Sequence, residues 1–114
     1  MPDQPLTYTT ANGAKEGTVV LSLSGPLTLA NIFTFQNDLR AIKPNCLIMD
    51  LSGVPFMDSA GLGVVMNYYV SAQGSNRKFF LAGVNDRINA LIQMTKVDSV
   101  LKVFPTVEAA EANA

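Results

Sequence analysis

Histidine is absent from the 114-residue sequence, and with it the side chain that most often serves as a general base, a triad base or a metal ligand. Asp58 and Ser59 could supply a base and a nucleophile. Neighbouring residues at a helix start rarely point at each other, however, and no histidine is available to complete a triad. We therefore expect no catalytic residue, no metal and no cofactor, and predict that the protein is not an enzyme.

Cysteine is almost absent as well. Cys46 is the single cysteine, which excludes a disulfide within the chain. It is followed by Leu47, Ile48 and Met49, so we predict that Cys46 is a buried core residue and not a reactive thiol.

Charge is also scarce. Asp, Glu, Lys and Arg make up 15% of the chain and the net charge is −1, so the sequence lacks the basic surface that nucleic acid or anionic lipid requires. No apolar run approaches the roughly 20 residues that cross a bilayer. Residues 1–17 lack the order of charged and apolar regions that marks a signal peptide. These features predict a cytoplasmic protein that neither binds nucleic acid nor inserts into a membrane.

Apolar residues make up 48% of the sequence, enough for the core of one domain of this length. Five segments have the pattern of β-strands: residues 6–11, 18–24, 46–51, 78–83 and 100–104. The segment 46–51 is apolar except for Asp50, which is typical of a central strand covered on both faces.

Four segments are predicted to be helical: residues 29–42 and the stretches that follow Asp58-Ser59, Asn85-Asp86 and Pro105-Thr106. Thr28 is the expected cap of the first helix. Its expected buried stripe is Ile32, Phe35, Leu39 and Ile42. Helices between strands imply crossovers onto a mostly parallel sheet, with an antiparallel edge formed by the first two strands. The predicted fold class is α/β, with one mixed, mostly parallel sheet of about five strands and about four helices.

The most informative segment is residues 56–63, Phe-Met-Asp-Ser-Ala-Gly-Leu-Gly. A polar pair opens a helix, and the small residues Ala60, Gly61 and Gly63 leave its first N–H groups accessible to an anion or to a partner's backbone. A simpler interpretation is that Asp58 or Ser59 only caps the helix. The segment lacks the lysine and the spacing of a phosphate-binding loop.

The helix that follows is expected to bury one face and expose the other. The expected buried residues are Leu62, Val65, Met66, Tyr69 and Val70. The expected outward residues include Val64, Asn67 and Tyr68, and we predict that they belong to a partner-docking surface beside Ser59. Phe33 lies off the apolar stripe of its own helix, so it covers either a core edge or a partner.

Residues 58–63, Asp-Ser-Ala-Gly-Leu-Gly, closely resemble the signature of STAS domains in bacterial anti-sigma factor antagonists. The strand ending Asp50-Leu51 and the loop ending Phe56-Met57 stand before the motif as they do in that family. The resemblance extends along most of the chain, as far as Val103-Phe104 and the Thr106 segment. It implies a single STAS domain over residues 1–114.

The resemblance also implies a function and partners. In this family, an anti-sigma factor that is also a serine kinase phosphorylates the serine after the motif's aspartate, and a phosphatase removes the phosphate. By position that serine is Ser59, which makes this chain a phosphoprotein of signal transduction and transcription regulation. The implied partner-binding residues are Asp58, Ser59, Ala60, Gly61, Gly63, Val64, Asn67 and Tyr68. The alternative is a STAS subunit of a lipid transporter, or a nucleotide- or lipid-sensing module, without a phosphorylation cycle.

The sequence departs from the family at one place. Many members have an acidic pair in a Gly-Glu-Leu-Asp pattern, whereas this chain has Gly25-Pro26-Leu27-Thr28. In the family this region lies beside the phosphorylated serine and contributes to partner binding. Pro26 and Thr28 therefore affect which partner is expected more than they affect the fold or the switch residue.

Overall fold

The structure, a computed structural model, describes residues 5–114 and centres on a five-stranded sheet in the order β1-β2-β3-β4-β5. The strands are β1 (Thr7–Asn12), β2 (Thr18–Ser24), β3 (Cys46–Gly53), β4 (Lys78–Ala82) and β5 (Lys102–Phe104). β1 is antiparallel to β2, and each later strand is parallel to its predecessor. The predicted mixed sheet is confirmed, including its antiparallel edge.

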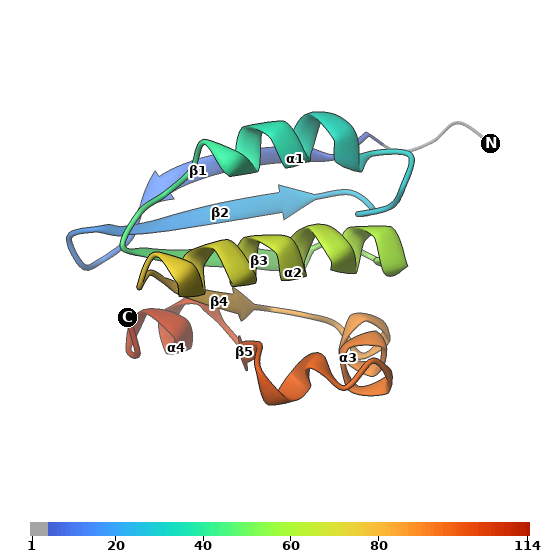
Figure 1. Ribbon diagram of the computed structural model, residues 1–114. Helices are drawn as coiled ribbons and strands as arrows, with labels where there is room; N and C mark the ends of the chain where they lie inside the picture. The colour runs from blue at the N-terminus through green and yellow to red at the C-terminus, as the bar shows by residue number, and fades with distance from the viewer. Residues whose placement is uncertain (1–4) are drawn as a thin grey trace.

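Four α-helices and one short 3₁₀ helix connect or follow the strands. They are α1 (Ile32–Arg40), α2 (Ser59–Gly74), α3 (Asp86–Met94), η1 (Val97–Ser99) and α4 (Val107–Glu111). Figure 1 shows α1 and α2 side by side across the sheet, with α3 beyond its lower edge in this view and α4 near the C-terminus.

The core has two parts because β3 is covered on both faces. Leu47, Met49 and Leu51 point into the larger cluster, which they share with α1, α2 and α3. Cys46 and Ile48 point the opposite way, into a smaller cluster with α4. The alternation confirms β3 as a central strand, and Cys46 as a core residue that is only 4% exposed.

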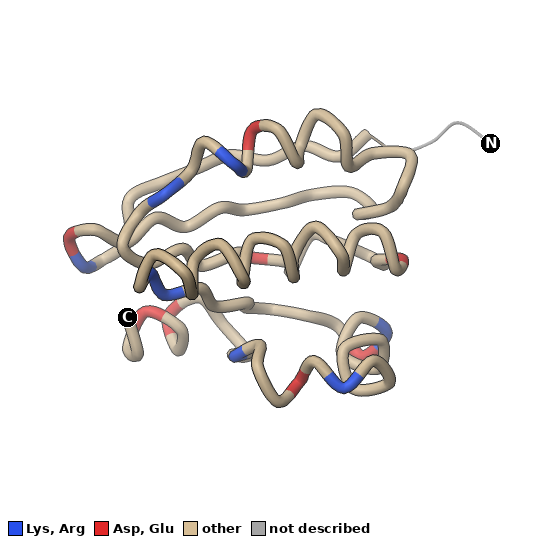
Figure 2. Tube along the Cα trace, in the orientation of Figure 1, with Lys and Arg blue, Asp and Glu red and all other residues tan. Residues whose placement is uncertain are grey.

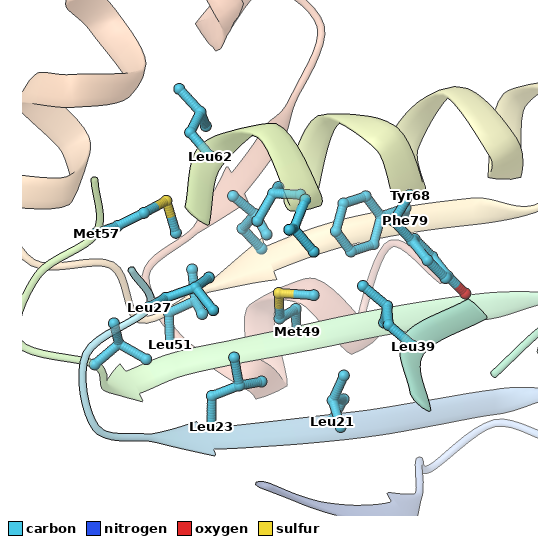
Figure 3. Close-up of a cluster of buried hydrophobic side chains, with 14 of the residues drawn as sticks. Leu21, Leu23, Leu27, Leu39, Met49, Leu51, Met57, Leu62, Tyr68 and Phe79 are labelled. Atoms are coloured by element: carbon cyan, nitrogen blue, oxygen red, sulfur yellow. The ribbon is translucent and has the colours of Figure 1, made fainter. Parts of the chain in front are cut away.

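The larger cluster lies between the sheet and the helices, and Figure 3 shows the part of it beneath α2. Leu21, Met49 and Leu81 come from successive strands and are fully buried. Tyr68 of α2 packs edge-on against Phe79 of β4, with ring centroids 4.9 Å apart. This packing fixes α2 on the sheet and therefore fixes the position of its N-terminus.

α1 begins later than predicted, at Ile32, and its N-cap is Asn31 and not Thr28. The preceding residues are held in a non-helical path, because Leu27 forms an isolated parallel bridge with Met57 and the Leu29 N–H donates to Asp58. The expected buried stripe is confirmed for Ile32, Phe35 and Leu39. Ile42 lies beyond the helix end and is only partly buried against the core.

Candidate functional site

Asp58 caps α2 and joins the helix to a neighbouring loop. Its backbone is extended, and Oδ1 accepts from the Gly61 N–H at 2.9 Å, which is the geometry of an N-cap. Oδ2 accepts from the Leu29 N–H at 3.1 Å. Of the two caps that the sequence allowed, the structure selects Asp58, and both of its carboxylate oxygens have donors.

The loop between β2 and α1 is fastened along the segment that leads into α2. The Leu27 N–H donates to the Phe56 carbonyl at 3.1 Å, and the Asp58 N–H donates to the Leu27 carbonyl at 3.2 Å. Pro26 is buried and Thr28 is partly buried in this loop. The two positions where the chain departs from the family pattern therefore lie in the loop that is hydrogen-bonded to the start of α2.

Ser59 is the first residue of α2 and is exposed. Its hydroxyl makes no hydrogen bond within residues 5–114. Gly63 is also exposed, with no atom within 4 Å of the position a Cβ would take, while Ala60 is partly buried against the core. A hydroxyl that is exposed and unengaged is accessible to a modifying enzyme.

Gly61 is buried, and its small size serves the interior. A Cβ at this position would lie 2.2 Å from the Leu27 carbonyl oxygen, so the glycine permits the close contact between α2 and the β2–α1 loop. The prediction that Gly61 makes room for a partner is therefore wrong. The close approach of the neighbouring loop explains the glycine at this position.

The outward positions of Val64 and Tyr68 were also predicted wrongly. Val64 is 4% exposed and Tyr68 is 6% exposed, because α1 packs beside α2 and covers this face. Asn67 is exposed as expected. Val70, expected to point inward, is 63% exposed.

Other apolar side chains are exposed near the start of α2. Leu29 is 59% exposed and Phe56 is 39% exposed, and both lie on the loops that hydrogen-bond to this end of the helix. Phe33, in the first turn of α1, is 68% exposed, so it covers no core edge. Leu29 and Phe56 were not predicted as site residues, because each stands beside other apolar residues in its loop and only the folded structure shows which of them are exposed.

The chemistry available at this end of the sheet is limited. A shallow hollow of about 590 Å³ beside the β3–α2 loop is lined by Ser24, Gly25, Ser52, Gly53, Val54, Pro55, Asn85 and two residues near the N-terminus, none of them ionisable. Within residues 5–114, no group of three or more Cys, Asp or Glu side chains is placed to hold a metal ion. A reactive group that remains at this end of the molecule is the exposed hydroxyl of Ser59.

Comparison with known proteins identifies the family. The family model described as "STAS domain" matches residues 9–110. This chain belongs to the STAS domain family. A relative from Thermotoga neapolitana, whose name makes it a candidate anti-sigma factor antagonist, is 30% identical over 99 residues, covering 83% of this chain and 88% of the relative. The anti-sigma F factor antagonist of Paenibacillus polymyxa is 24% identical over 92 residues, covering 77% of this chain and 79% of the relative.

Several solved structures share the fold of this chain. The crystal structure of an anti-sigma factor antagonist from Mycobacterium paratuberculosis has a TM-score of 0.86 at 24% identity, covering 99% of this chain and 96% of that chain. The phosphorylated form of the Bacillus cell fate determinant SpoIIAA has a TM-score of 0.72 at 17% identity, covering 94% of this chain and 98% of that chain. At these identities the likeness concerns the fold alone. The fold agrees with the one predicted from the resemblance of residues 58–63 to STAS domains. Within residues 5–114 no helix is both long and apolar enough to span a membrane.

Proposed function

We propose that this STAS domain is an anti-sigma factor antagonist that works as a phosphorylation-controlled binding switch in the bacterial cytoplasm. The unphosphorylated form binds an anti-sigma factor that is also a serine kinase. Phosphorylation of Ser59 weakens that complex, and a phosphatase restores it. The proposal assigns the protein a binding role and no catalysis of its own.

The observation that carries this proposal is that the Ser59 hydroxyl is exposed and makes no hydrogen bond within residues 5–114. Both carboxylate oxygens of its neighbour Asp58 accept backbone hydrogen bonds. A phosphoryl group added to Ser59 therefore breaks no internal hydrogen bond. The names of the relatives support the choice of partner class.

Phosphorylation is expected to change binding more than folding. A phosphate adds roughly −1.5 to −2 charges at the N-terminus of α2, where the helix dipole tolerates a negative group. A partner that covers this position has to remove water from a bulky dianion beside the Asp58 carboxylate, which costs free energy unless a cation compensates it. The domain stays folded while its complex weakens.

The proposed docking surface is revised by the structure. Asp58, Ser59, Ala60, Gly63 and Asn67 stay in it because each keeps at least part of its surface accessible. The apolar contacts that we had assigned to Val64 and Tyr68 are assigned instead to Leu29, Phe33 and Phe56. Gly61 contributes by shaping the backbone beneath this surface.

The test uses a purified anti-sigma factor with kinase activity, ATP and this domain. We expect mass spectrometry to find one phosphate, on Ser59. We expect Ser59→Ala to keep the wild-type affinity and Ser59→Asp to bind at least about tenfold more weakly. Treatment of the phosphorylated domain with a serine phosphatase should restore binding.

Ser99→Asp is the matched control, since Ser99 is also exposed but lies in η1. It adds the same charge and should leave affinity unchanged. Absence of phosphate on Ser59, together with equal affinities for the wild type, Ser59→Ala and Ser59→Asp, would contradict the proposal. That result would favour the alternative role as a transporter subunit or sensing module.

A further inference from the structure

Val64 and Tyr68 lie outside the proposed docking surface, but together with Asn67 they line a second surface feature. They line a groove of about 350 Å³ between α1 and α2, with Gln36, Leu39, Arg40, Lys43, Ser71 and Arg77. Asn67 and Tyr68 lie eight and nine residues after Ser59 on α2, which at 1.5 Å per residue is about 13 Å along the helix axis. The groove therefore does not include Ser59, although it shares Asn67 with the proposed docking surface.

The base of the groove is apolar and rigid. Leu39, Val64 and Tyr68 are 2%, 4% and 6% exposed. The Tyr68 ring is held edge-on against Phe79, and its hydroxyl donates to the Ile42 carbonyl at 2.7 Å. A flat apolar molecule can lie against such a surface without first ordering it.

Three cations line the groove, and no carboxylate does. Arg40 and Lys43 are exposed and make no hydrogen bond or ion pair within residues 5–114. Asp38, near them on α1, instead accepts a hydrogen bond from Tyr8 of β1. The 16 residues of α2 include no charged side chain, so nothing on that side of the groove balances the cations (Figure 2).

Arg77 is oriented by the groove itself. One of its terminal nitrogens donates to the Tyr68 hydroxyl at 3.1 Å, the other lies 3.4 Å from the Ser71 hydroxyl, and its guanidinium carbon lies 5.5 Å from the centre of the Tyr68 ring. These contacts use two of the five N–H donors of a guanidinium group. The remaining donors are available to an anion.

Two of the three cations have an ordinary structural role. Arg40 lies in the last turn of α1, where the helix dipole favours a positive charge, and Arg77 packs on Tyr68. Neither role explains why three positive groups surround one apolar cleft with no counter-charge, an arrangement that raises the local positive potential and attracts anions. A bound anion accounts for all three together.

We propose that the groove between α1 and α2 binds a small organic anion that carries a flat apolar body. The anionic group is held by Arg40, Lys43 and Arg77, and the apolar body lies against Leu39, Val64 and Tyr68. The volume matches the small end of ligand pockets, which span about 300–1,000 Å³. An acidic segment of a protein is the competing occupant, and the small volume favours the small molecule.

The test is a titration of the isotope-labelled domain with 1-naphthyl phosphate, followed by amide chemical shifts. We expect shifts at Gln36, Asn67 and Ser71, and an affinity that falls as salt is added. The double variant Arg40→Gln with Lys43→Gln should bind about tenfold more weakly, because two charge-assisted contacts are lost. Lys96→Gln with Lys102→Gln is the matched control, since it removes the same charge outside the groove and should bind as the wild type does.

Two further probes separate the parts of the proposed ligand. 1-Naphthol lacks the charge and inorganic phosphate lacks the apolar body, so both should bind at least about tenfold more weakly than 1-naphthyl phosphate. Equal binding of 1-naphthol, absence of shifts up to about 1 mM, or a loss of affinity in the Lys96/Lys102 control would overturn the proposal. Tighter binding of a hexaglutamate peptide would also overturn it, and would assign the groove to an acidic protein partner.

Discussion

Gly61 and Gly63 lie two residues apart on α2 in opposite environments. Gly61 faces the Leu27 carbonyl of the β2–α1 loop, whereas the position of a Cβ on Gly63 is open. Glycine in a helix costs up to about 1 kcal/mol relative to alanine, so the two residues need separate explanations. The contact with the Leu27 carbonyl requires a glycine at position 61, whereas no contact within residues 5–114 requires a glycine at position 63.

This difference gives a prediction with its own control. Gly61→Ala should lower the free energy of unfolding by about 1–3 kcal/mol, because the new methyl group collides with backbone that has to move. Gly63→Ala should raise it by about 0.5–1 kcal/mol through improved helix propensity. Urea unfolding at neutral pH measures both, and equal stability of the two variants would contradict the assigned contact.

At the residue scale, sequence reasoning located Asp58 and Ser59 because a polar pair before small residues is a strong local signal. It could not find the contact between Gly61 and Leu27. That contact joins segments more than thirty residues apart, and a glycine at a helix start looks the same whether it faces a partner or its own loop. The distinction depends on the path of the loop, which tertiary packing sets.

α2 shows why an element can be predicted correctly while its faces are not. The helix has apolar residues around most of its circumference and no charged residue in 16, so the pattern does not identify a single exposed face. The helix also packs on two neighbours, which are α1 and the sheet, where Tyr68 contacts Phe79 of β4. If only one face is assumed to be buried, the pattern places Val64 and Tyr68 in solvent and Val70 in the core, which is the reverse of the structure.

α4 is a short helix with a specific task, since it covers the face of the sheet that contains Cys46. Its N-cap is Thr106, whose hydroxyl accepts from the Ala109 N–H at 3.1 Å. Burial raises the pKa of the Cys46 thiol, although Lys78 and Lys15 partly oppose that shift. The thiol is therefore expected to react slowly while α4 is in place.

Removal of this cap should make Cys46 more accessible. Thr106→Val should destabilise α4 by about 1 kcal/mol. The fraction of molecules in which α4 has detached from the sheet then rises about fivefold, and the rate at which Cys46 reacts with a disulfide reagent rises by the same factor. Thr95→Val is the control, because the Thr95 hydroxyl donates at the end of α3, on the other side of the sheet. An unchanged thiol reaction rate in Thr106→Val would show that the thiol is reached by another route.

For the whole molecule, the α/β class and the mostly parallel sheet with its antiparallel edge followed from the alternation of apolar segments with helix-length segments, and residues 46–51 were apolar enough to be identified as central. The least predictable parts were the loops. Residues 29–31 were predicted to be helical because Thr28 is a good cap, but they form a turn before α1, and the pairing of Leu27 with Met57 and of Leu29 with Asp58 holds this loop in place. Long-range backbone pairing of this kind has no local sequence signature.

The titration of the whole domain follows from three groups whose pKa is raised. A hydrogen bond to Asp38 and burial raise the pKa of Tyr8 to about 12. Burial raises the pKa of Tyr68, against the opposing effect of Arg77, and burial also raises the pKa of Cys46. In each case the unfolded chain loses its proton at a lower pH than the folded chain does.

Stability should therefore fall on the alkaline side. Above about pH 8.5 for Cys46 and about pH 10 for the tyrosines, the unfolded state binds fewer protons than the folded state, so the free energy of unfolding decreases as pH rises. Between about pH 6 and 8 it should stay nearly constant, because no histidine titrates. Urea unfolding across pH 6–11 measures the curve, and Tyr8→Phe should show a smaller decline above about pH 10.

The C-terminal residue lies at the opposite end of the molecule from the start of α2 (Figure 1). Its backbone carbonyl accepts a hydrogen bond from Lys15 at 2.8 Å, and Glu111 accepts one from the Ala14 N–H at 2.8 Å, so this end is fastened to the β1–β2 turn. If the protein is attached to a solid support through a tether after Ala114, the hydrogen bond to that carbonyl is kept and Ser59 faces away from the support. Immobilisation through this end should therefore present the switch to a soluble kinase or partner in a uniform orientation.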